Sequence, residues 1–431
     1  MEIQKAAQAA KAASIQLAAA ETQTKQKALK AIAKALDADR ENIVAANRED
    51  LRVSAANNLA PPLLKRLKFD EKKIAEVIDG IESLLVLPDP VGATLAATQM
   101  DEGLELYKVS CPIGVIGVVF ESRPDALVQI STLCLKSGNA VLLKGGSEAT
   151  HTNRILASVI REASEKAGIP GGWLQLLETR EDVNSMLKLD EFIDLIIPRG
   201  SNEFVRYIMD HSRIPVLGHA DGICHVFVDA DADLDMAVRI AVDAKCQYVA
   251  VCNAMETLLV HETVAANFLP GLQQALKAHD VEIRGCPKTR SIIKVAEAGV
   301  QDWKTEYLDA ILSIKVVGSL QEAINHINTY GSGHTDAIVT GNPEAAAMFM
   351  DLCDSGNVFW NCSTRFSDGF RYGLGAEVGI STNKIHARGP VGLEGLVIYK
   401  WKLKGSGQIA ADYAAGKKQF THRPLDKPFE I

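Results

Sequence analysis

From residue 113 onward the sequence alternates between short apolar runs and amphipathic stretches, and this pattern restricts the fold more than any other feature. The first set of apolar runs predicts strands over 113–120, 140–144, 173–177, 194–197 and 226–228. The amphipathic stretches beside them predict helices over 126–137, 150–167 and 202–211. A second set predicts strands over 257–260, 310–317 and 337–340 and helices over 233–244 and 321–329. Strands that alternate with helices are typical of a parallel sheet with helices on its faces, so the fold class is α/β.

The two ends of the chain have a different pattern. Residues 1–85 are rich in Ala, Lys, Glu and Leu with apolar residues three to four apart, which predicts helices interrupted by a turn near Pro61-Pro62. Residues 93–111 alternate apolar and polar around an Asp-Glu-Gly turn, which predicts a β-hairpin. Residues 393–404 begin as a strand and lead into a polar tail.

Composition excludes several classes of protein. The 431 residues include 54 acidic and 46 basic side chains, a net charge of −8, which argues against nucleic acid as a partner. The N-terminus carries charges early, and no apolar run approaches the roughly 18 residues of a membrane span, so we expect a cytoplasmic protein without a membrane partner. The eight cysteines form no Cys-x-x-Cys pair, so we expect no bound metal.

Two turns between a strand and a helix have residues suited to phosphate. Lys144, Gly145 and Ser147 follow one apolar run, and Gly200 and Ser201 follow another after Arg199. Small residues at such a turn let backbone N–H groups and a helix N-terminus approach a phosphate group. Neither turn matches a dinucleotide fingerprint or a P-loop, and each also fits an ordinary loop with a helix cap.

Cys252 lies directly before an apolar run and is followed by the polar Asn253. A thiol held near backbone amides has its thiolate stabilised, and a thiolate attacks activated carbonyls to form thioesters. The pattern alone does not distinguish Cys252 from Cys246, six residues earlier.

Several segments resemble the aldehyde dehydrogenase superfamily. Pro112–Gly117 (PIGVIG) is similar to its strand entry, and Gly138-Asn139 with Val141–Glu148 (VLLKGGSE) is similar to its Gly-Asn and Lys-Pro-Ser-Glu segments. Val317–Ile338, ending in Ser-Gly-His-Thr-Asp, resembles the γ-glutamyl phosphate reductase branch of that superfamily. Asn361–Gly369 and Gly373–Pro390 are similar to the same branch.

The resemblance implies a role for particular residues of the site. Cys252 falls at the nucleophilic cysteine, and Asn253 at the asparagine that follows it and contacts substrate. Glu306 falls at the glutamate that holds the nicotinamide ribose, although the sequence alone favours a solvated charge of a helix or loop. Arg123 is a candidate contact for an acyl phosphate or a carboxylate, with a surface ion pair as the alternative. His334 is a candidate substrate contact, with a histidine that caps a turn as the alternative.

The cofactor is implied in the same way. Lys144 falls where the superfamily contacts the adenine ribose, and a lysine there suits the 2′-phosphate of NADP(H), with Gly145 and Ser147 in the same turn. Gly200 and Ser201 fall at the turn over the pyrophosphate.

Two segments depart from the superfamily pattern. Glu121–Pro124 replaces its Trp-Asn-Phe segment, which supplies an oxyanion donor. Leu217–Gly222 (LGHADG) stands where hydrolytic members carry Glu-Leu-Gly-Gly, and it contains no glutamate to activate water. A reductase that works through a thioester is expected to lack that glutamate, because water would hydrolyse the intermediate.

The resemblance therefore implies an enzyme that reduces L-glutamyl 5-phosphate with NADPH to L-glutamate 5-semialdehyde and phosphate, through a thioester on Cys252, in proline biosynthesis. It implies a doubly wound NADP-binding domain over 1–92 and 112–225 and an α/β catalytic domain over 226–395. Residues 93–111 and 396–431 are expected to form an oligomerisation arm and C-terminal segment of a homo-oligomer. A separate glutamate 5-kinase is a candidate partner, since no kinase domain is expected in these residues. Two alternatives stay open at this point: a CoA-dependent acylating aldehyde dehydrogenase, and a catalytically silent relative that acts as a binding protein.

Overall fold

The protein divides into two compact units in a computed structural model, which describes residues 3–178, 180–219 and 221–430. Unit 1 comprises residues 1–200, 207–217 and 392–431, and unit 2 comprises residues 201–206 and 218–391. The expected boundary at 225/226 falls inside a strand of unit 2, Cys224–Val228, because the loop that leads into this strand packs with unit 2. No helix among the described residues is long and apolar enough to cross a membrane.

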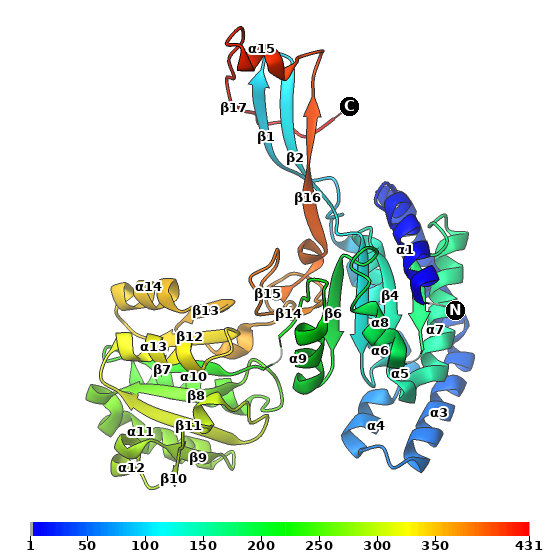
Figure 1. Ribbon diagram of the computed structural model, residues 1–431. Coiled ribbons are helices and arrows are strands. Elements are labelled where there is room, and N and C mark those ends of the chain that lie inside the picture. The colour runs from blue at the N-terminus through cyan, green and yellow to red at the C-terminus, as the bar shows by residue number, and fades with distance from the viewer. Residues whose placement is uncertain (1–2, 179, 220, 431) are drawn as a thin grey trace. The chain divides into compact units, whose positions relative to one another are not determined.

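Unit 1 is built around a parallel sheet of four strands in the order β5-β4-β3-β6 (Figure 1). The strands are β3 (Val115–Phe120), β4 (Ala140–Lys144), β5 (Leu174–Leu177) and β6 (Leu195–Arg199). Every residue of β3 and β4 is buried, which is why both read as continuous apolar runs in the sequence. The chain winds outward from β3 through β4 to β5 and then returns to place β6 on the other side of β3. This order creates a topological switch point between β3 and β6, the position at whose carboxyl edge open α/β sheets bind ligands.

Helices cover both faces of this sheet. The helices of unit 1 are α1 (Ile3–Leu17), α2 (Thr22–Ala38), α3 (Arg40–Ala56), α4 (Pro61–Leu67), α5 (Glu71–Val86), α6 (Pro124–Lys136), the 3-10 helix η1 (Ser147–Ala149), α7 (Thr150–Lys166) and α8 (Arg180–Met186). The residues of α9 (Asn202–His211) are divided between unit 2 and unit 1. On one face α1 contacts β3, β4 and β5 through a stripe of alanines, whose small side chains allow close approach. On the other face α6 and α7 contact the sheet, with α2, α3 and α5 packed on them. The helical expectation for residues 1–85 is confirmed by α1 to α5.

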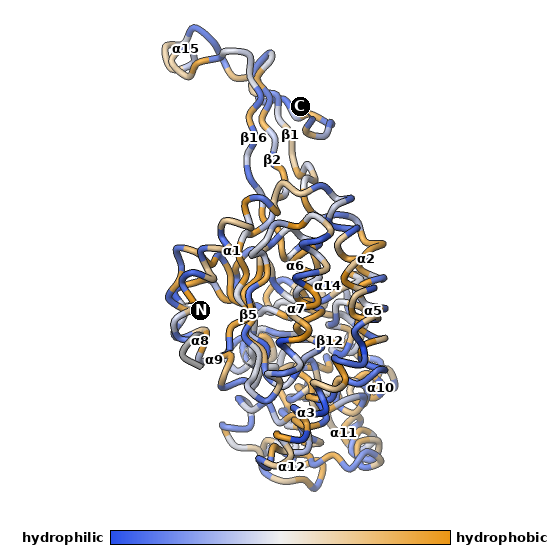
Figure 2. Tube along the Cα trace, turned by 90° about the vertical axis from the view of Figure 1, so that its right-hand side faces the viewer, coloured by the Kyte–Doolittle hydropathy of each residue, from blue (hydrophilic) through white to orange (hydrophobic). Residues whose placement is uncertain are grey.

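A four-stranded antiparallel sheet, which we call the arm, extends from the rest of unit 1 (Figure 1). Its elements are β1 (Thr94–Asp101), β2 (Leu104–Pro112), η4 (Leu393–Leu396), β16 (Val397–Lys404), α15 (Ala410–Ala414) and β17 (Arg423–Pro424). The expected hairpin is formed by β1 and β2, and β16 pairs with β2 along its whole length. Hydrophobic and hydrophilic positions are interleaved along these strands in Figure 2, as alternation in an exposed sheet requires.

Unit 2 contains a seven-stranded parallel sheet in the order β10-β9-β11-β8-β7-β12-β13. Its strands are β7 (Cys224–Val228), β8 (Met255–His261), β9 (Glu282–Gly285), β10 (Ala296–Glu297), β11 (Ile311–Val317), β12 (Thr335–Val339) and β13 (Asn357–Trp360), and a separate pair is formed by β14 (Gly379–Ser381) and β15 (Gly389–Val391). The helices are α10 (Leu234–Cys246), α11 (Glu262–Lys277), α12 (Pro287–Ile292), η2 (Asp302–Lys304), α13 (Leu320–Tyr330), α14 (Pro343–Leu352) and η3 (Thr364–Phe366). One apolar core lies between the sheet and α10, α11 and α12, and a second lies between the sheet and α13 and α14. The sheet of unit 2 is therefore also covered on both faces.

Candidate active site

Three loops of unit 2 meet at the amino edge of its central strands. The loop 218–223 leads into β7, the loop 247–254 leads into β8, and the loop 331–334 leads into β12. The strands β8, β7 and β12 are neighbours and run in the same direction, so their preceding loops lie at one edge. Cys252 lies in the second of these loops, three residues before Met255, the first residue of β8.

The loops of β7 and β8 are in backbone contact at Cys252. A Cβ atom on Gly222 would lie 2.0 Å from the Cys252 carbonyl oxygen and 2.4 Å from its Cα, so no other residue fits at position 222 without a shift. The Cys224 thiol donates to the same carbonyl oxygen at 3.2 Å. Gly222 was not singled out from the sequence, because nothing in the one-dimensional pattern shows which loops approach one another.

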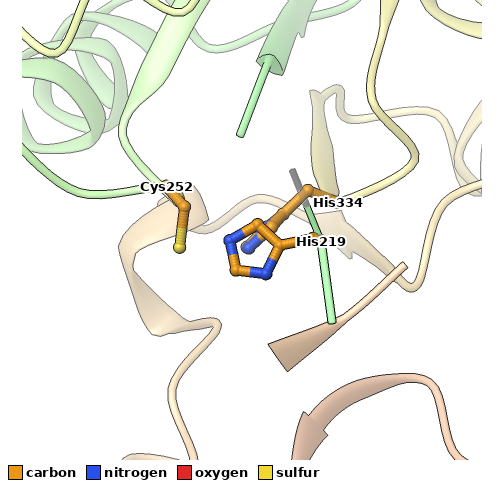
Figure 3. A group of neighbouring side chains, drawn as sticks. All are labelled: His219, Cys252 and His334. Atoms are coloured by element: carbon orange, nitrogen blue, oxygen red, sulfur yellow. The ribbon is translucent and has the colours of Figure 1, made fainter. Parts of the chain in front are cut away.

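Two histidines lie beside the Cys252 thiol, one from each neighbouring loop (Figure 3). The sulfur of Cys252 and one ring nitrogen each of His219 and His334 all lie within 4.8 Å of one another. The two imidazole rings form an edge-to-face pair with centroids 4.9 Å apart. His334 was a candidate from the sequence, whereas His219 appeared only as part of the segment that lacks a glutamate.

The histidines differ in their surroundings. His334 is fully buried, with its Nδ1 2.7 Å from the Thr335 hydroxyl and no partner for its Nε2 among the described residues. Burial, with the neighbouring His219, holds the pKa of His334 well below the ordinary value of a histidine. His219 is partly exposed, and its Nδ1 lies 3.0 Å from the carbonyl oxygen of Ile380 in β14. His334 is therefore a neutral, buried ring beside the Cys252 thiol, and its contact with substrate stays a prediction.

The electrostatics around Cys252 differ from the sequence expectation of a stabilised thiolate. Burial, reinforced by the carboxylates of Glu306 and Glu377, raises the pKa of the Cys252 thiol to about 12. Its own backbone N–H and the Arg365 guanidinium act in the opposite direction, and they do not offset the burial. The thiol is therefore protonated at neutral pH and needs a base before it can attack a substrate.

Asn253 clamps the loop of Cys252 to a turn near η3. Its side-chain amide donates to the carbonyl oxygen of Ser367 at 2.7 Å, and its own carbonyl oxygen accepts from the Thr364 hydroxyl at 2.7 Å. The side-chain oxygen of Asn253 is buried and has no partner among the described residues. Asn253 thus positions the loop, and the substrate contact expected for it stays a prediction.

Glu306 lies in the same unit and acts on the thiol electrostatically. Its carboxylate accepts from the Asn202 amide, and burial together with the neighbouring Asp221 raises its pKa. Asp221, the only carboxylate in the segment 217–222, forms an ion pair with Arg206 and also lies 3.3 Å from the Asn202 amide. Ala220 of that segment lies outside the described residues. Because Asp221 is already paired with Arg206, its carboxylate is poorly suited to activate a water molecule.

A buried ion pair lies behind Glu306. Lys245 and Glu256 are fully buried and 2.6 Å apart, and the second carboxylate oxygen of Glu256 accepts from the backbone N–H of Leu308 at 3.4 Å. Leu308 has a positive φ of 52°, a conformation that a leucine adopts only when its surroundings impose it. The pair thereby fixes the turn that follows Glu306.

In unit 1 the predicted phosphate turn follows β4. Lys144 is buried at the end of this strand, and its ammonium group donates to the carbonyl oxygen of Gly145. Ser147 begins η1, and Glu148 accepts from the backbone and the hydroxyl of Ser122 at 2.6 Å each. This ties the turn after β4 to the turn after β3, at the carboxyl edge of the sheet beside the switch point. Gly200 follows β6 at the same edge, and Ser201 begins the short segment that belongs to unit 2.

Arg123 precedes α6 in unit 1, where its guanidinium lies 3.6 Å from the carboxylate of Asp125. The side chain is 44% exposed, as the alternative of a surface ion pair anticipated. Its contact with substrate stays a prediction.

Known proteins share both the sequence and the fold of this chain. A model of the aldehyde dehydrogenase family matches residues 1–291. The γ-glutamyl phosphate reductase of Pelotomaculum thermopropionicum is 68% identical over 431 residues, which cover 100% of this chain and 99% of that protein. The chain belongs to the aldehyde dehydrogenase family.

Solved structures of family members extend the comparison. The γ-glutamyl phosphate reductase of Thermotoga maritima superposes with a TM-score of 0.93 at 42% identity, covering 95% of this chain and 100% of that one. An acetylating aldehyde dehydrogenase from Geobacillus thermoglucosidasius superposes with a TM-score of 0.63 at 17% identity over 95% of this chain and 97% of that one, a likeness of fold alone. The expected aldehyde-dehydrogenase-like fold and the resemblance to the phosphate reductase branch are both confirmed.

Membership of the family restricts how the cluster of Cys252, His219 and His334 is interpreted. One thiol and two imidazoles can chelate a soft metal ion. A thiolate held by a metal would not be free to attack a carbonyl, which is the chemistry of a cysteine in an aldehyde dehydrogenase. We therefore assign no metal to the cluster.

Proposed function

We propose that this chain reduces L-glutamyl 5-phosphate with NADPH to L-glutamate 5-semialdehyde and phosphate, as a step of proline biosynthesis. The observation that carries the proposal is the Cys252 thiol, with the imidazoles of His219 and His334 beside it and no glutamate in the segment 217–222. Such a thiol can form a thioester, and the segment beside it offers no glutamate that would activate water to hydrolyse this thioester. The substrate is taken from the similarity over 431 residues to proteins named γ-glutamyl phosphate reductase.

The residues at the carboxyl edge of the unit 1 sheet fit a nicotinamide dinucleotide. The edge lies beside a topological switch point, and the turns after β3 and β4 are tied together there by Glu148. The buried ammonium group of Lys144 supports NADP(H) over NAD(H), since it can pair with a 2′-phosphate. When bound, the cofactor supplies a hydride to the carbonyl carbon of the thioester. Glu306 would hold its nicotinamide ribose, and Gly200 and Ser201 would contact its pyrophosphate.

The chain's own residues supply a nucleophile and its surroundings. The Cys252 sulfur attacks the acyl carbon, and the bond from that carbon to the phosphate oxygen breaks. Arg123 and Asn253 are proposed to contact the substrate, and His334 forms a neutral wall beside the reacting atoms. The tight packing of Gly222 against Cys252 holds the sulfur in place, which contributes to catalysis by fixing the reacting geometry.

The proposal also includes an assembly and a location. The arm is proposed to join copies of this chain into a homo-oligomer, and a separate glutamate 5-kinase is proposed to deliver the acyl phosphate. A nucleophilic thiol has to stay reduced, so we propose the reducing environment of the cytoplasm.

The reverse reaction tests the function. Semialdehyde and NADP⁺ are mixed with the enzyme, and NADPH is followed with and without phosphate. We expect about one turnover per site without phosphate and continued turnover once phosphate is added, because assisted attack of water is worth roughly 10²- to 10⁴-fold and the segment 217–222 contains no glutamate to assist it. Continued turnover with CoA in place of phosphate would identify a CoA-dependent enzyme, and steady turnover with neither would identify a hydrolytic one.

A further inference from the structure

We propose that His219 is a catalytic acid–base residue that carries the proton of the Cys252 thiol to the departing phosphate. This inference rests on the proposed function and assigns to His219 a role that the sequence did not reveal. His219 lies in the segment that carries the water-activating glutamate in hydrolytic relatives. In this chain a side chain of that segment therefore acts on the thiol and not on a water molecule.

The tautomer of His219 follows from its hydrogen bond. A carbonyl oxygen only accepts, so Nδ1, which lies 3.0 Å from the Ile380 oxygen, carries the hydrogen. In the neutral ring this leaves Nε2 with a lone pair. Figure 3 shows the edge of the ring opposite its attachment, where Nε2 lies, turned toward the Cys252 sulfur. A carbonyl that fixes one ring nitrogen so that the other faces a nucleophile is the arrangement a general base requires.

The thiol of Cys252 requires such a base. Burial, with Glu306 and Glu377, holds its pKa near 12, so very little thiolate exists at neutral pH. The Arg365 guanidinium acts in the opposite direction, and its Nε donates a hydrogen bond to Gln247 at 2.9 Å. Asp221 is paired with Arg206, and the carboxylates of Glu306 and Glu377 oppose a thiolate, so these three groups do not replace the base.

His334 is less suited to this role. Burial holds the pKa of His334 well below the ordinary value, which makes this ring a weak base. It is also fully buried, whereas His219 is partly exposed and can pass a proton onward. His334 is a neutral ring in edge-to-face contact with the ring of His219. This contact helps to position the His219 ring near the Cys252 sulfur and adds no charge to the site.

The proton balances over the first half-reaction. The hydrogen of the Cys252 thiol moves to Nε2 of His219 as the sulfur bonds to the acyl carbon. The bond between that carbon and the phosphate oxygen breaks with its electron pair on oxygen, and Nε2 returns the proton to this oxygen, so that hydrogen phosphate leaves. After hydride transfer the thiohemiacetal oxyanion collapses to the aldehyde, and the sulfur leaves as thiolate and takes one proton from solvent through His219. One proton is consumed overall, together with one hydride.

Alkylation of the resting enzyme tests the base without any substrate. Iodoacetamide reacts with the thiolate and expels iodide, so its rate at Cys252, followed by peptide mapping across a range of pH, reports deprotonation of that thiol. The variant His219→Asn keeps an amide hydrogen in the place of Nδ1 and removes Nε2. The matched variant His334→Asn removes the other Nε2, and Cys246 in the same samples serves as an internal control.

We expect His219→Asn to slow alkylation of Cys252 by roughly 100-fold or more near pH 7.5, because a positioned base is typically worth about 10²- to 10⁴-fold. The variant and the wild-type rates should converge as the pH rises toward the pKa of the thiol, because hydroxide then replaces the base. His334→Asn should change the rate much less, and alkylation of Cys246 should be the same in all three proteins. A wild-type rate in His219→Asn, or a loss confined to His334→Asn, overturns the proposal. Because no phosphate, semialdehyde or cofactor is present, either outcome is separate from the identity of the substrate.

Discussion

At the scale of single residues, Cys252 illustrates that the environment of a thiol is set by tertiary contacts. The sequence places it before a strand and next to Asn253, and both are observed. Its neighbours in space are instead His219, His334, Glu306 and Glu377, which are 33 to 125 positions away along the chain. A high pKa and a nearby imidazole follow from those neighbours and not from residues 251–253.

Replacing Cys252, the proposed nucleophile, is the most direct test of the site. Cys252→Ser should abolish reduction of the acyl phosphate, because a serine hydroxyl is a far weaker nucleophile at this position. NADPH binding, measured by fluorescence titration, should change little. Cys246→Ser is the matched control, since Cys246 ends α10 and packs on the core of unit 2. Near-full turnover in Cys252→Ser would remove the thioester from the mechanism.

The proposed preference for NADPH is assigned to the ammonium group of Lys144. Lys144→Ala should weaken NADPH more than NADH, by about 10- to 100-fold, because a charge-assisted hydrogen bond is worth roughly 1.5 to 3 kcal/mol. The two dissociation constants, measured separately, give the ratio. Lys166→Ala, which removes an exposed lysine at the end of α7, should leave it unchanged. Equal losses for both cofactors would mean that Lys144 does not contact the 2′-phosphate.

At the scale of elements, the site exists because three parallel strands begin at one edge of a sheet. Each of β7, β8 and β12 was predicted as a strand, yet sequence alone did not show that they are neighbours. The order of strands decides which loops meet, and it brings residues 219, 252 and 334 together. Elements were missed where local signals conflict. One is α11, which continues through Pro270-Gly271 even though both residues normally interrupt a helix.

The contact between two of these loops gives a prediction about packing. Gly222→Ala should destabilise the protein by about 1 to 3 kcal/mol, the usual cost of overpacking, since its Cβ would meet backbone atoms of Cys252. It should also alter the alkylation rate of Cys252, because the loop that carries the thiol has to move. Thermal unfolding and peptide mapping measure the two effects.

Gly271→Ala provides the comparison, because a Cβ there meets nothing within 4 Å in α11. Alanine is favoured over glycine in a helix by about 1 kcal/mol, so this variant should be neutral or slightly stabilised. If Gly222→Ala behaved like Gly271→Ala, the close approach of the two loops would not be a requirement of the site.

At the scale of the whole molecule, the arm leaves apolar surface uncovered. Its core is small, formed by Ala97, Tyr107 and Val109 with Leu425 and Phe429 packed on them. Along the edge strand β16 the side chains of Tyr399, Trp401 and Leu403 share one face and are 48%, 58% and 60% exposed. An edge strand with a row of exposed apolar side chains is a surface that proteins normally cover by association.

Disrupting that face should therefore change the oligomeric state. Trp401→Glu should weaken self-association by about tenfold or more, equivalent to about 1.4 kcal/mol, as measured by sedimentation over a range of concentrations. Val300→Glu is the matched control, since Val300 is an apolar side chain of unit 2 with 68% exposure. An unchanged association constant for Trp401→Glu would show that β16 is not the interface.

The sequence by itself determined the α/β class, the positions of most strands and helices of both units, the hairpin of the arm and the family. These features follow from the periodicity of hydrophobic residues, from turn residues and from contiguous motifs, all of which involve residues that are close together in the sequence. Only the tertiary structure decided that β7 belongs wholly to unit 2, that Gly222 lies against Cys252, and that the Cys252 thiol is protonated and faced by His219. Strand order, close approach of loops and the polarity around a buried group depend on residues far apart in sequence. A single chain read in one dimension contains no signal of which of them meet.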